Sequence, residues 1–475
     1  MTCWPALRGT TTMASDNGDL ESVQNNRDAV NAILRSRLNS RRRVPASPSQ
    51  QRLWILNQLG ADESAYNLGR AFVLLGKLKV DVLEQSMNYV LMRHEALRAS
   101  FVSIDGFPFQ IFGSKEQALS VRIMDCLEMS DDEMARMITE EVNRPFDLSR
   151  GPLVRALLLR KDEEKHVFIV TMHHIVTDGW SLRLFFEELS ELYSAFIDGH
   201  PSPLPNLQIR YAEYWDAQRS YVDDDQLRVQ LDYWMQVLGS ECPTLLLPTD
   251  HQRAPRSVHR GAVHRIALSS DVARAVHELG KSESATSYMV LLTAFKALLY
   301  RYTGLCDIAI GTPVTGRKGE AAEKLIGFFV NTLVVRSSLR GELTYREALR
   351  RVRQNTLEAQ DRQDVPFDRI VQHLQRSRLP GNNPFFQVMF AFQGLPPAGL
   401  RLADLEIEEL NVDKARVPLE LALSISSAGD GFSAVFEYSR DLFEVETIER
   451  MAGHFKTLLE GVIADPGCRL SELPL

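Results

Sequence analysis

Cysteine is scarce in this sequence of 475 residues, and its five cysteines lie far apart. No CxxC pair and no cluster of cysteine and histidine is present, which argues against a disulfide framework and against the common zinc sites. We therefore expect no bound metal, and free thiols in the reducing environment of the cytoplasm. The cysteines are Cys3, Cys126, Cys242, Cys306 and Cys468.

Long apolar runs are also missing. No stretch reaches the roughly 18 apolar residues that a membrane-spanning helix needs, and the N-terminal segment lacks the apolar centre of a signal peptide. Positive charge is in the minority, because 54 Lys and Arg stand against 62 Asp and Glu, for a formal net charge of −8. Since no basic stripe stands out, we expect neither nucleic acid nor a membrane among the partners.

The length of the chain exceeds what one ordinary hydrophobic core supports, so two lobes are expected. Apolar strands and amphipathic helices follow one another without strict alternation, which predicts an α/β or α+β fold. We divide the chain into a leader at 1–43, an N-terminal lobe at 44–216 and a C-terminal lobe at 217–475. The leader is expected to be partly disordered. Its weak amphipathic helix at 20–38 is either solvated or docks to a partner chain, and Met13 is an alternative start.

The clearest chemical signal is the segment at 167–181, VFIVTMHHIVTDGWS. A buried apolar strand runs into His173 and His174, and Asp178 and Gly179 follow in a turn before a helix. Buried ionisable rings are costly unless they have a partner or a task. Successive side chains of a strand point to opposite faces, so the two rings cannot both reach one small ligand. This argues against a metal pair and predicts one structural ring and one ring that faces a cavity.

A covalent nucleophile is disfavoured, because no serine or cysteine elbow stands out. No G-x-S-x-G elbow is present in the chain, so direct acyl transfer with a histidine base is the simpler chemistry. Asp178 lies just past the strand, where it can pair with an arginine and fix the turn. Arg93 and Arg98 stand near the end of a helix predicted for 81–97 and leave it in different directions, so one of them could meet a carboxylate.

The segment MHHIVTDGWS resembles the HHxxxDG core of condensation domains from non-ribosomal peptide synthetases, in the chloramphenicol-acetyltransferase-like superfamily. Six other segments resemble further motifs of this family in the right order. The family often has Asp at the position of Glu213 and His at the position of Arg362, and these departures are mild. The six segments are SPSQQRLWILNQL, RHEALRASF, YAEYW, IGFFVNTLVVR, DRQDVPFDRIV and NNPFFQVMF.

The resemblance implies two acetyltransferase-like lobes that form a V around a central tunnel. Two phosphopantetheine arms enter this tunnel, one with an acyl thioester donor and the other with an aminoacyl acceptor, and an amide forms between them. It further implies that His174 faces the tunnel, and that His173 and Asp178 are structural. The resemblance also implies that Asp178 pairs with Arg93 or Arg98.

Further site residues follow from the same segments. Gly179 allows a backbone or a ligand to come close. Trp180 is a candidate for support of the tunnel, and Asn331 is either a tunnel-lining polar group or a hydrogen-bonded residue inside a sheet. The domain itself is expected to bind no cofactor, because its substrates are carried on the phosphopantetheine of a carrier protein or on CoA.

The resemblance leaves the donor open. The chain begins with Met and has no upstream carrier, so we favour a starter domain of lipopeptide biosynthesis. It would N-acylate the first amino acid with a fatty acyl group from acyl-CoA or an acyl carrier protein. The alternative is an elongation domain whose upstream synthetase docks in trans. An epimerization domain and a non-catalytic recruitment domain fit the motifs less well. The C-terminal LSELPL resembles the start of a linker to an adenylation domain.

Overall fold

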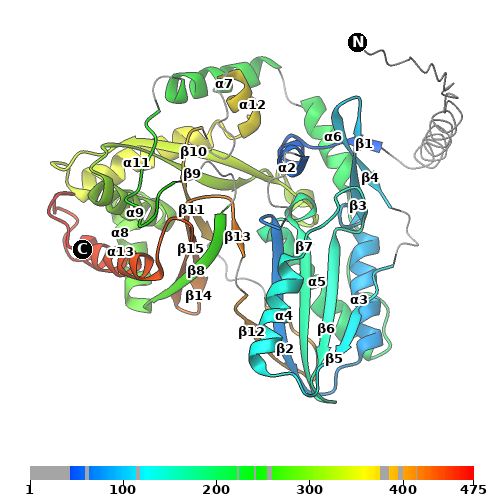
Figure 1. Cartoon of the computed structure of the whole chain (residues 1–475). Coiled ribbons are helices and arrows are strands. Elements are labelled where there is room, and N and C mark those ends of the chain that lie inside the picture. Colours follow the sequence, from blue (N-terminus) through cyan, green and yellow to red (C-terminus); the bar gives the residue numbers. More distant parts are fainter. Residues whose placement is uncertain are drawn as a thin grey trace, which may run out of the picture.

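The computed structural model places two lobes side by side (Figure 1). The expected leader helix at 20–38 and the alternative start at Met13 lie outside the described residues. No helix in the described part of the chain is long and apolar enough to cross a membrane. The described residues are 43–58, 64–113, 118–221, 224–239, 242–253, 259–374, 384–393, 399–412 and 415–475.

The N-terminal lobe is built on a sheet with the strand order β12-β2-β7-β6-β5. Its middle strand β7 (Lys165–His173) is buried along nearly its whole length, because helices cover both faces of the sheet. α3 (Val80–Arg93) and α5 (Gly179–Ile197) pack on one face, and α4 (Asp131–Asn143) packs on the other. The other strands are β2 (Asn67–Leu75), β5 (Arg122–Asp125), β6 (Val154–Arg160) and β12 (Glu406–Leu410).

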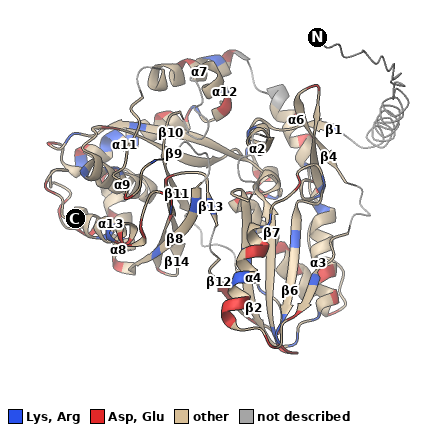
Figure 2. Ribbon diagram, in the orientation of Figure 1, with Lys and Arg blue, Asp and Glu red and all other residues tan. Residues whose placement is uncertain are grey.

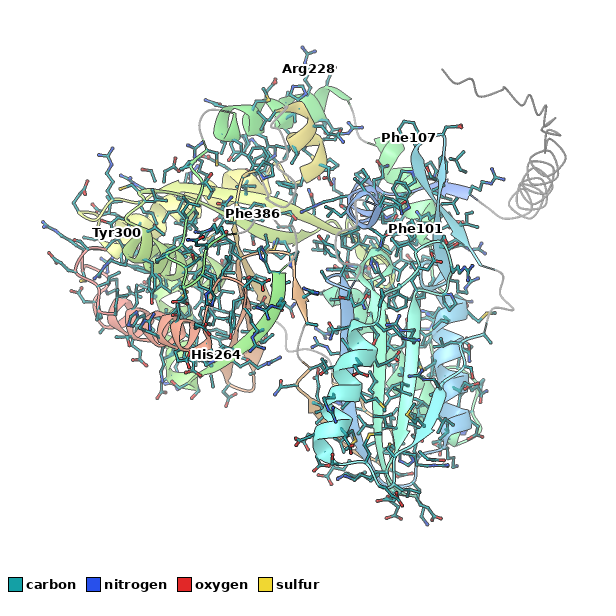
Figure 3. The ribbon with its side chains drawn as sticks, in the orientation of Figure 1. Phe101, Phe107, Arg228, His264, Tyr300 and Phe386 are labelled. Atoms are coloured by element: carbon teal, nitrogen blue, oxygen red, sulfur yellow. The ribbon has the colours of Figure 1, made fainter. Side chains whose placement is uncertain are left out.

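A smaller sheet with the order β1-β4-β3 stands at one end of this lobe. Asp105 and Gly106 have positive φ angles of 52° and 83° in the tight turn of its hairpin, and Phe107 beside them is 68% exposed (Figure 3). The opposite end of the hairpin packs with two helices into a core that contains Phe101. The elements are β1 (Arg43–Pro45), β3 (Ala99–Ile104), β4 (Phe107–Phe112), α2 (Pro48–Gln58) and α6 (Tyr211–Tyr221).

The C-terminal lobe is built on a larger sheet with the order β10-β9-β11-β14-β15-β8-β13. The strands are β8 (His259–Leu268), β9 (Asp307–Thr315), β10 (Val330–Ser338), β11 (Val388–Gln393), β13 (Arg416–Val417), β14 (Leu421–Ala428) and β15 (Gly431–Ser439). The short helix α10 (Glu320–Glu323) lies in the connection from β9 to β10.

Helices cover both faces of this sheet as well. α9 is almost wholly buried because it packs between the sheet and other helices, which explains its run of apolar residues. Phe386, labelled in Figure 3, belongs to the core on the opposite face. The first face carries α8 (Ser270–Ser282), α9 (Ser287–Thr303), α11 (Tyr345–Gln360) and α13 (Val445–Ala464), and the second carries α7 (Asp224–Leu238) and α12 (Phe367–His373).

One strand crosses between the lobes. β12 pairs antiparallel with β2, from Glu406 opposite Leu75 to Leu410 opposite Ala71, and so forms the edge of the N-terminal sheet. The predicted division at residue 217 assigned residues 406–410 to the C-terminal lobe, and for this segment it is wrong. The reason is that β2 offers an unpaired edge, which a strand from anywhere in the chain can cover.

A loop also crosses between the lobes. The nearly continuous apolar run from Ile326 to Arg336 predicts one buried strand, but β10 begins only at Val330. The four residues before it end the segment at 316–329, which connects β9 to β10 and which we call the connecting loop. Three of their amides bond to side chains of the N-terminal lobe instead of to a neighbouring strand. A short apolar run does not distinguish a buried loop from a buried strand, which is why the prediction was wrong here.

Candidate active site

The two histidines lie at a change of backbone structure. β7 ends at His173, and His174 begins a short 3-10 turn that extends to Val176. Asp178 then caps α5, since its carboxylate accepts the backbone N–H of Ser181 at 2.7 Å. The predicted order of strand, turn and helix is therefore confirmed, and the turn begins with a 3-10 helix.

His173 is locked inside the lobe. Its side chain is 1% exposed, and its Nδ1 accepts the backbone N–H of Ile175 at 3.1 Å, so the neutral ring carries its proton on Nε2. The ring meets Phe146 edge to face with centroids 6.2 Å apart. Burial, with smaller contributions from the neighbouring His174 and Arg155, lowers the pKa of His173 to about 3. This ring is neutral at physiological pH.

His174 has the opposite arrangement. It is partly exposed, and its Nδ1 lies 2.7 Å from the carbonyl oxygen of Thr177. A carbonyl can only accept, so Nδ1 must carry the proton and the lone pair of the neutral ring is on Nε2. The backbone N–H of His174 donates to the carbonyl of Tyr66 at 2.8 Å, and Phe328 meets the ring edge to face at 4.9 Å. The turn thus fixes both the tautomer and the direction of a basic nitrogen.

The segment SPSQQRLWILNQL holds the same turn. Gln50 is fully buried, and its Nε2 donates to the carbonyl of Ile175 at 3.0 Å. Its Oε1 accepts the backbone N–H of Ser47 at 2.9 Å. The sequence pattern singles out this segment but predicts no role for Gln50, and only the three-dimensional contact reveals one.

Asp178 pairs with Arg317 of the connecting loop. Nη2 of Arg317 lies 3.0 Å and 3.3 Å from the two carboxylate oxygens, and the Arg317 and Asp178 side chains are 2% and 3% exposed. Asp178 also accepts the backbone N–H of Phe329 at 3.1 Å. Nη1 of Arg317 donates to the carbonyls of Ala322 and Leu325, both at 2.7 Å. The buried ion pair therefore ties the histidine turn to the other lobe.

The expectation that Asp178 pairs with Arg93 or Arg98 is wrong. Arg93 donates to Glu188 of α5 at 3.0 Å. Arg98 donates to the backbone carbonyls of Leu91 and Gly113, at 2.9 Å and 2.7 Å. The last carbonyls of a helix need donors, and Arg98 supplies one to the end of α3. Arg317 was missed because it stands in a glycine-containing loop without any periodic signal.

Side chains of the N-terminal lobe hold the end of the connecting loop residue by residue. Ser181 Oγ donates to the carbonyl of Gly327 at 2.7 Å and accepts its N–H at 3.0 Å. A Cβ at residue 327 would lie 2.1 Å from the ring of Tyr211, so this close packing requires glycine. The further bonds are Ile326 N–H to His94 Nδ1 at 3.2 Å, Tyr211 O–H to Phe328 O at 2.8 Å, and Trp180 Nε1–H to Glu323 O at 2.8 Å.

The remaining predicted residues have different surroundings. Gly179 is exposed, and a Cβ there would lie 3.4 Å from Nε2 of Gln393 at the end of β11. Trp180 is 41% exposed and fastens the connecting loop. Asn331 donates to the carbonyls of residues 363 and 365, and it accepts from the amides of residues 332 and 367. Its amide is thus fully hydrogen-bonded, which agrees with the structural alternative.

Charge around the site is of mixed sign. Figure 2 shows acidic and basic residues spread over both lobes. Within the described ranges, no group of three or more His, Cys, Asp and Glu side chains could hold a metal ion. The chemistry that the site itself offers is a half-buried imidazole with a basic Nε2, whose turn is held by hydrogen bonds to Thr177, Tyr66 and Gln50. Such a group can orient an amine and accept its proton.

A family model described as "Condensation domain" matches residues 40–475. One of the chains of linear gramicidin synthase from Brevibacillus parabrevis is 40% identical over 438 residues, which are 91% of this chain and 6% of that protein. Malpinin synthetase from Mortierella alpina is 39% identical over 424 residues, which are 89% of this chain and 6% of that protein. The chain therefore spans a small part of the length of these relatives.

Solved structures share the fold. A four-domain nonribosomal peptide synthetase bound to AMP and glycine superposes with a TM-score of 0.82 at 23% identity, over 91% of this chain and 34% of that one. The X-domain from teicoplanin biosynthesis gives 0.80 at 26% identity, over 91% and 98%. The first condensation domain of the calcium-dependent antibiotic synthetase gives 0.77 at 19%, over 91% and 99%. The chain belongs to the family of condensation domains of non-ribosomal peptide synthetases, acyltransferases that form amide bonds.

Proposed function

We propose that this domain joins an acyl thioester donor to the amine of an aminoacyl group on a carrier protein, and that His174 is its catalytic residue. The observation that carries the proposal is the hydrogen bond from Nδ1 of His174 to the Thr177 carbonyl. It leaves the basic lone pair on Nε2, in a ring that is only partly buried and that stands beside a loop from the other lobe.

The proposed step balances without a cofactor. The neutral amine attacks the thioester carbonyl, Nε2 of His174 accepts the proton that the amine loses, and the C–N bond forms. The C–S bond then breaks, and the proton returns to the departing thiolate. His173 takes no part, because its ring is sealed in the core and its Nδ1 is already bonded to Ile175.

His174 need not account for the whole rate enhancement of amide formation. An α-amine has a pKa near 8, so an appreciable fraction is neutral at physiological pH. General base catalysis contributes about 10²- to 10⁴-fold, and alignment of the two reacting groups is worth up to about 7–11 kcal/mol. We therefore assign His174 both tasks, orientation of the amine and acceptance of its proton.

We consider two alternative donors for this reaction. One is a fatty acyl group from acyl-CoA or an acyl carrier protein, which would make this a starter domain of lipopeptide biosynthesis in the cytoplasm. Similarity to three separate chains of linear gramicidin synthase favours the alternative, a donor delivered by another synthetase chain, because these relatives divide one synthase among several chains. The further proposed partners are the acceptor carrier protein, with its phosphopantetheine arm, and an adenylation domain.

A non-catalytic role is the other class of function. The X-domain from teicoplanin biosynthesis has been solved in complex with OxyB, and it superposes on this chain with a TM-score of 0.79 at 26% identity. The fold alone is therefore compatible with recruitment. The position of His174 favours catalysis, and substitution of this residue distinguishes the two roles.

The test compares His174→Asn with His174→Ala in a single-turnover assay of amide formation. Asn can keep a donor toward the Thr177 carbonyl but lacks the basic Nε2. We expect both variants to fold and to lose about 10²-fold or more of the rate. Offering fatty acyl-CoA and peptidyl-carrier donors with an aminoacyl-carrier acceptor, and weighing the products by mass spectrometry, separates starter from elongation. Normal turnover by His174→Asn would refute the catalytic assignment, and no product with any donor would refute the proposed function.

A further inference from the structure

His94 is a second buried histidine close to the active-site turn, and the proposed reaction does not use it. It follows α3 within the segment RHEALR and is 2% exposed. Its Nδ1 accepts the backbone N–H of Ile326 at 3.2 Å, and its Nε2 lies 2.8 Å from Oε2 of Glu188. A backbone amide can only donate, so Nδ1 must be unprotonated and Nε2–H must donate to the carboxylate.

Glu188 links the ring of His94 to α5, the helix that directly follows the active-site turn. Glu188 lies on α5, which Asp178 caps, and its other oxygen accepts from Arg93 at 3.0 Å. The Glu188 side chain is 6% exposed and that of Arg93 is 10% exposed. Burial lowers the pKa of His94, and the charges of Arg93 and Arg317 lower it further, while Glu188 raises it. The net direction is downward, so Nδ1 keeps its lone pair at physiological pH.

Ile326, whose amide donates to His94, stands two residues before Phe328, which contacts the ring of His174. Phe328 meets His174 edge to face at 4.9 Å. The amides of residues 326, 327 and 329 donate in turn to His94, Ser181 and Asp178. Loss of the first of these bonds would free the loop on the side of Ile326 and allow Phe328 to shift against His174. Displacement of a reacting group by about 1 Å can cost about 10²-fold in rate.

We propose that His94 is a positioning residue for amide formation: its Nδ1 holds the Ile326 amide and thereby sets Phe328 against the ring of His174. The role is distinct from that of Asp178, which holds the Phe329 amide of the same loop and Arg317. It rests on the proposed function, because its kinetic consequence presumes that His174 is catalytic. Loss of this role should lower kcat more than it raises KM, since His94 touches no substrate.

Two isosteric variants separate the two nitrogens. In His94→Asn the side-chain oxygen can take the place of Nδ1 and accept from Ile326, whereas in His94→Gln the amide reaches the place of Nε2 and leaves Ile326 without its acceptor. We expect His94→Gln to lose about 10-fold in kcat with the KM values for donor and acceptor within about 2-fold, and His94→Asn to stay within about 3-fold of the wild type. A general loss of structure would affect both variants alike.

Hydrogen exchange gives a readout that is independent of activity. The Ile326 amide should exchange slowly in the wild type and in His94→Asn, and at least about 10-fold faster in His94→Gln. If the wild type forms no amide with any donor, the proposed function fails, while the exchange data still test the anchor. Equal kcat values for the two variants, or equal exchange at Ile326, would overturn the proposal.

The wild type offers a check that needs no variant. Selective ¹⁵N labelling of histidine reports which ring nitrogen of His94 carries the proton. We expect an unprotonated Nδ1 and a protonated Nε2 near neutral pH. The opposite tautomer, or a doubly protonated ring, would leave Ile326 without an acceptor and would overturn the proposal, whether or not the variants fold.

Discussion

Two of the segments that join the lobes differ strongly in construction. β12 joins the N-terminal sheet through its backbone, and three of its five side chains are exposed glutamates. The connecting loop at 316–329 instead reaches its partners through buried side chains, above all the ion pair of Arg317 with Asp178. A backbone ladder accepts many sequences, whereas a buried charge network depends on each member. We therefore expect substitutions near the catalytic turn to destabilise the domain more than substitutions in β12.

The largest effect is expected from Asp178→Ala. The change leaves Arg317 buried without its carboxylate and removes the acceptor of the Ser181 and Phe329 amides. Removing one partner of a buried pair costs about 3–5 kcal/mol, a large share of a typical domain stability. Urea unfolding measures the loss. Asp178→Asn is the matched control, since it keeps an oxygen acceptor and should lose less; a loss below about 1 kcal/mol for Asp178→Ala would contradict the structural role.

Ser181→Ala should have a smaller effect at the same junction. Ser181 Oγ bonds both the N–H and the carbonyl of Gly327 and also accepts from Arg317. A buried polar group left unsatisfied costs about 1–3 kcal/mol. The measurement is again urea unfolding, with Ser194→Ala on the same helix as control, because that hydroxyl donates to a carbonyl of its own helix. Equal losses for the two serines would contradict a special role of the junction.

Acid should destabilise the domain through His173, the residue at the start of the turn. Its pKa is about 3 in the folded protein and about 6.5 when unfolded. Between these values the unfolded chain binds the extra proton, so stability falls as the pH falls from about 6.5 toward 3, by about 1.4 kcal/mol per pH unit. His173→Asn keeps an acceptor for the Ile175 amide and does not titrate. Its unfolding free energy should fall less steeply from pH 6.5 to 5; an equal slope would contradict the assignment.

The smallest effect is expected at the β12 junction. Arg70 and Glu409 pair across β2 and β12 at 3.5 Å, with side chains 41% and 37% exposed. Exposed pairs contribute about 0–1 kcal/mol and weaken in salt. Glu409→Ala should therefore change the unfolding free energy by less than about 0.5 kcal/mol. A loss as large as that of Ser181→Ala would remove the contrast between the two junctions.

Much of the fold could be predicted from local pattern. The strand that became β7 and the helix that became α5 correspond to the predicted elements, because burial on one or both faces leaves a regular signature. The two histidines do have different surroundings, as predicted, but the cause is the change from strand to 3-10 turn between them and not alternation along a strand. Elements without such a signature are harder to predict from sequence. The apolar pattern of residues 326–329 fits a strand, but these residues are buried in a loop.

Long-range partners could not be predicted in the same way. Arg317 lies 139 residues after Asp178, in a stretch with no periodicity, while Arg93 and Arg98 stood in a conspicuous motif. The roles of His94 and Gln50 were hidden for another reason. Both stand in recognisable segments, but each acts through one backbone group of a distant residue, and no side-chain pattern records a bond to a backbone amide or carbonyl.

The most direct test of the central claim is a double-mutant cycle on Asp178 and Arg317, followed by urea unfolding. If the buried ion pair joins the histidine turn to the connecting loop, the two single variants should each be strongly destabilised, and the double variant should recover part of the loss. We predict a coupling energy of about 2–3 kcal/mol. A coupling energy near zero, with losses that simply add, would contradict the account.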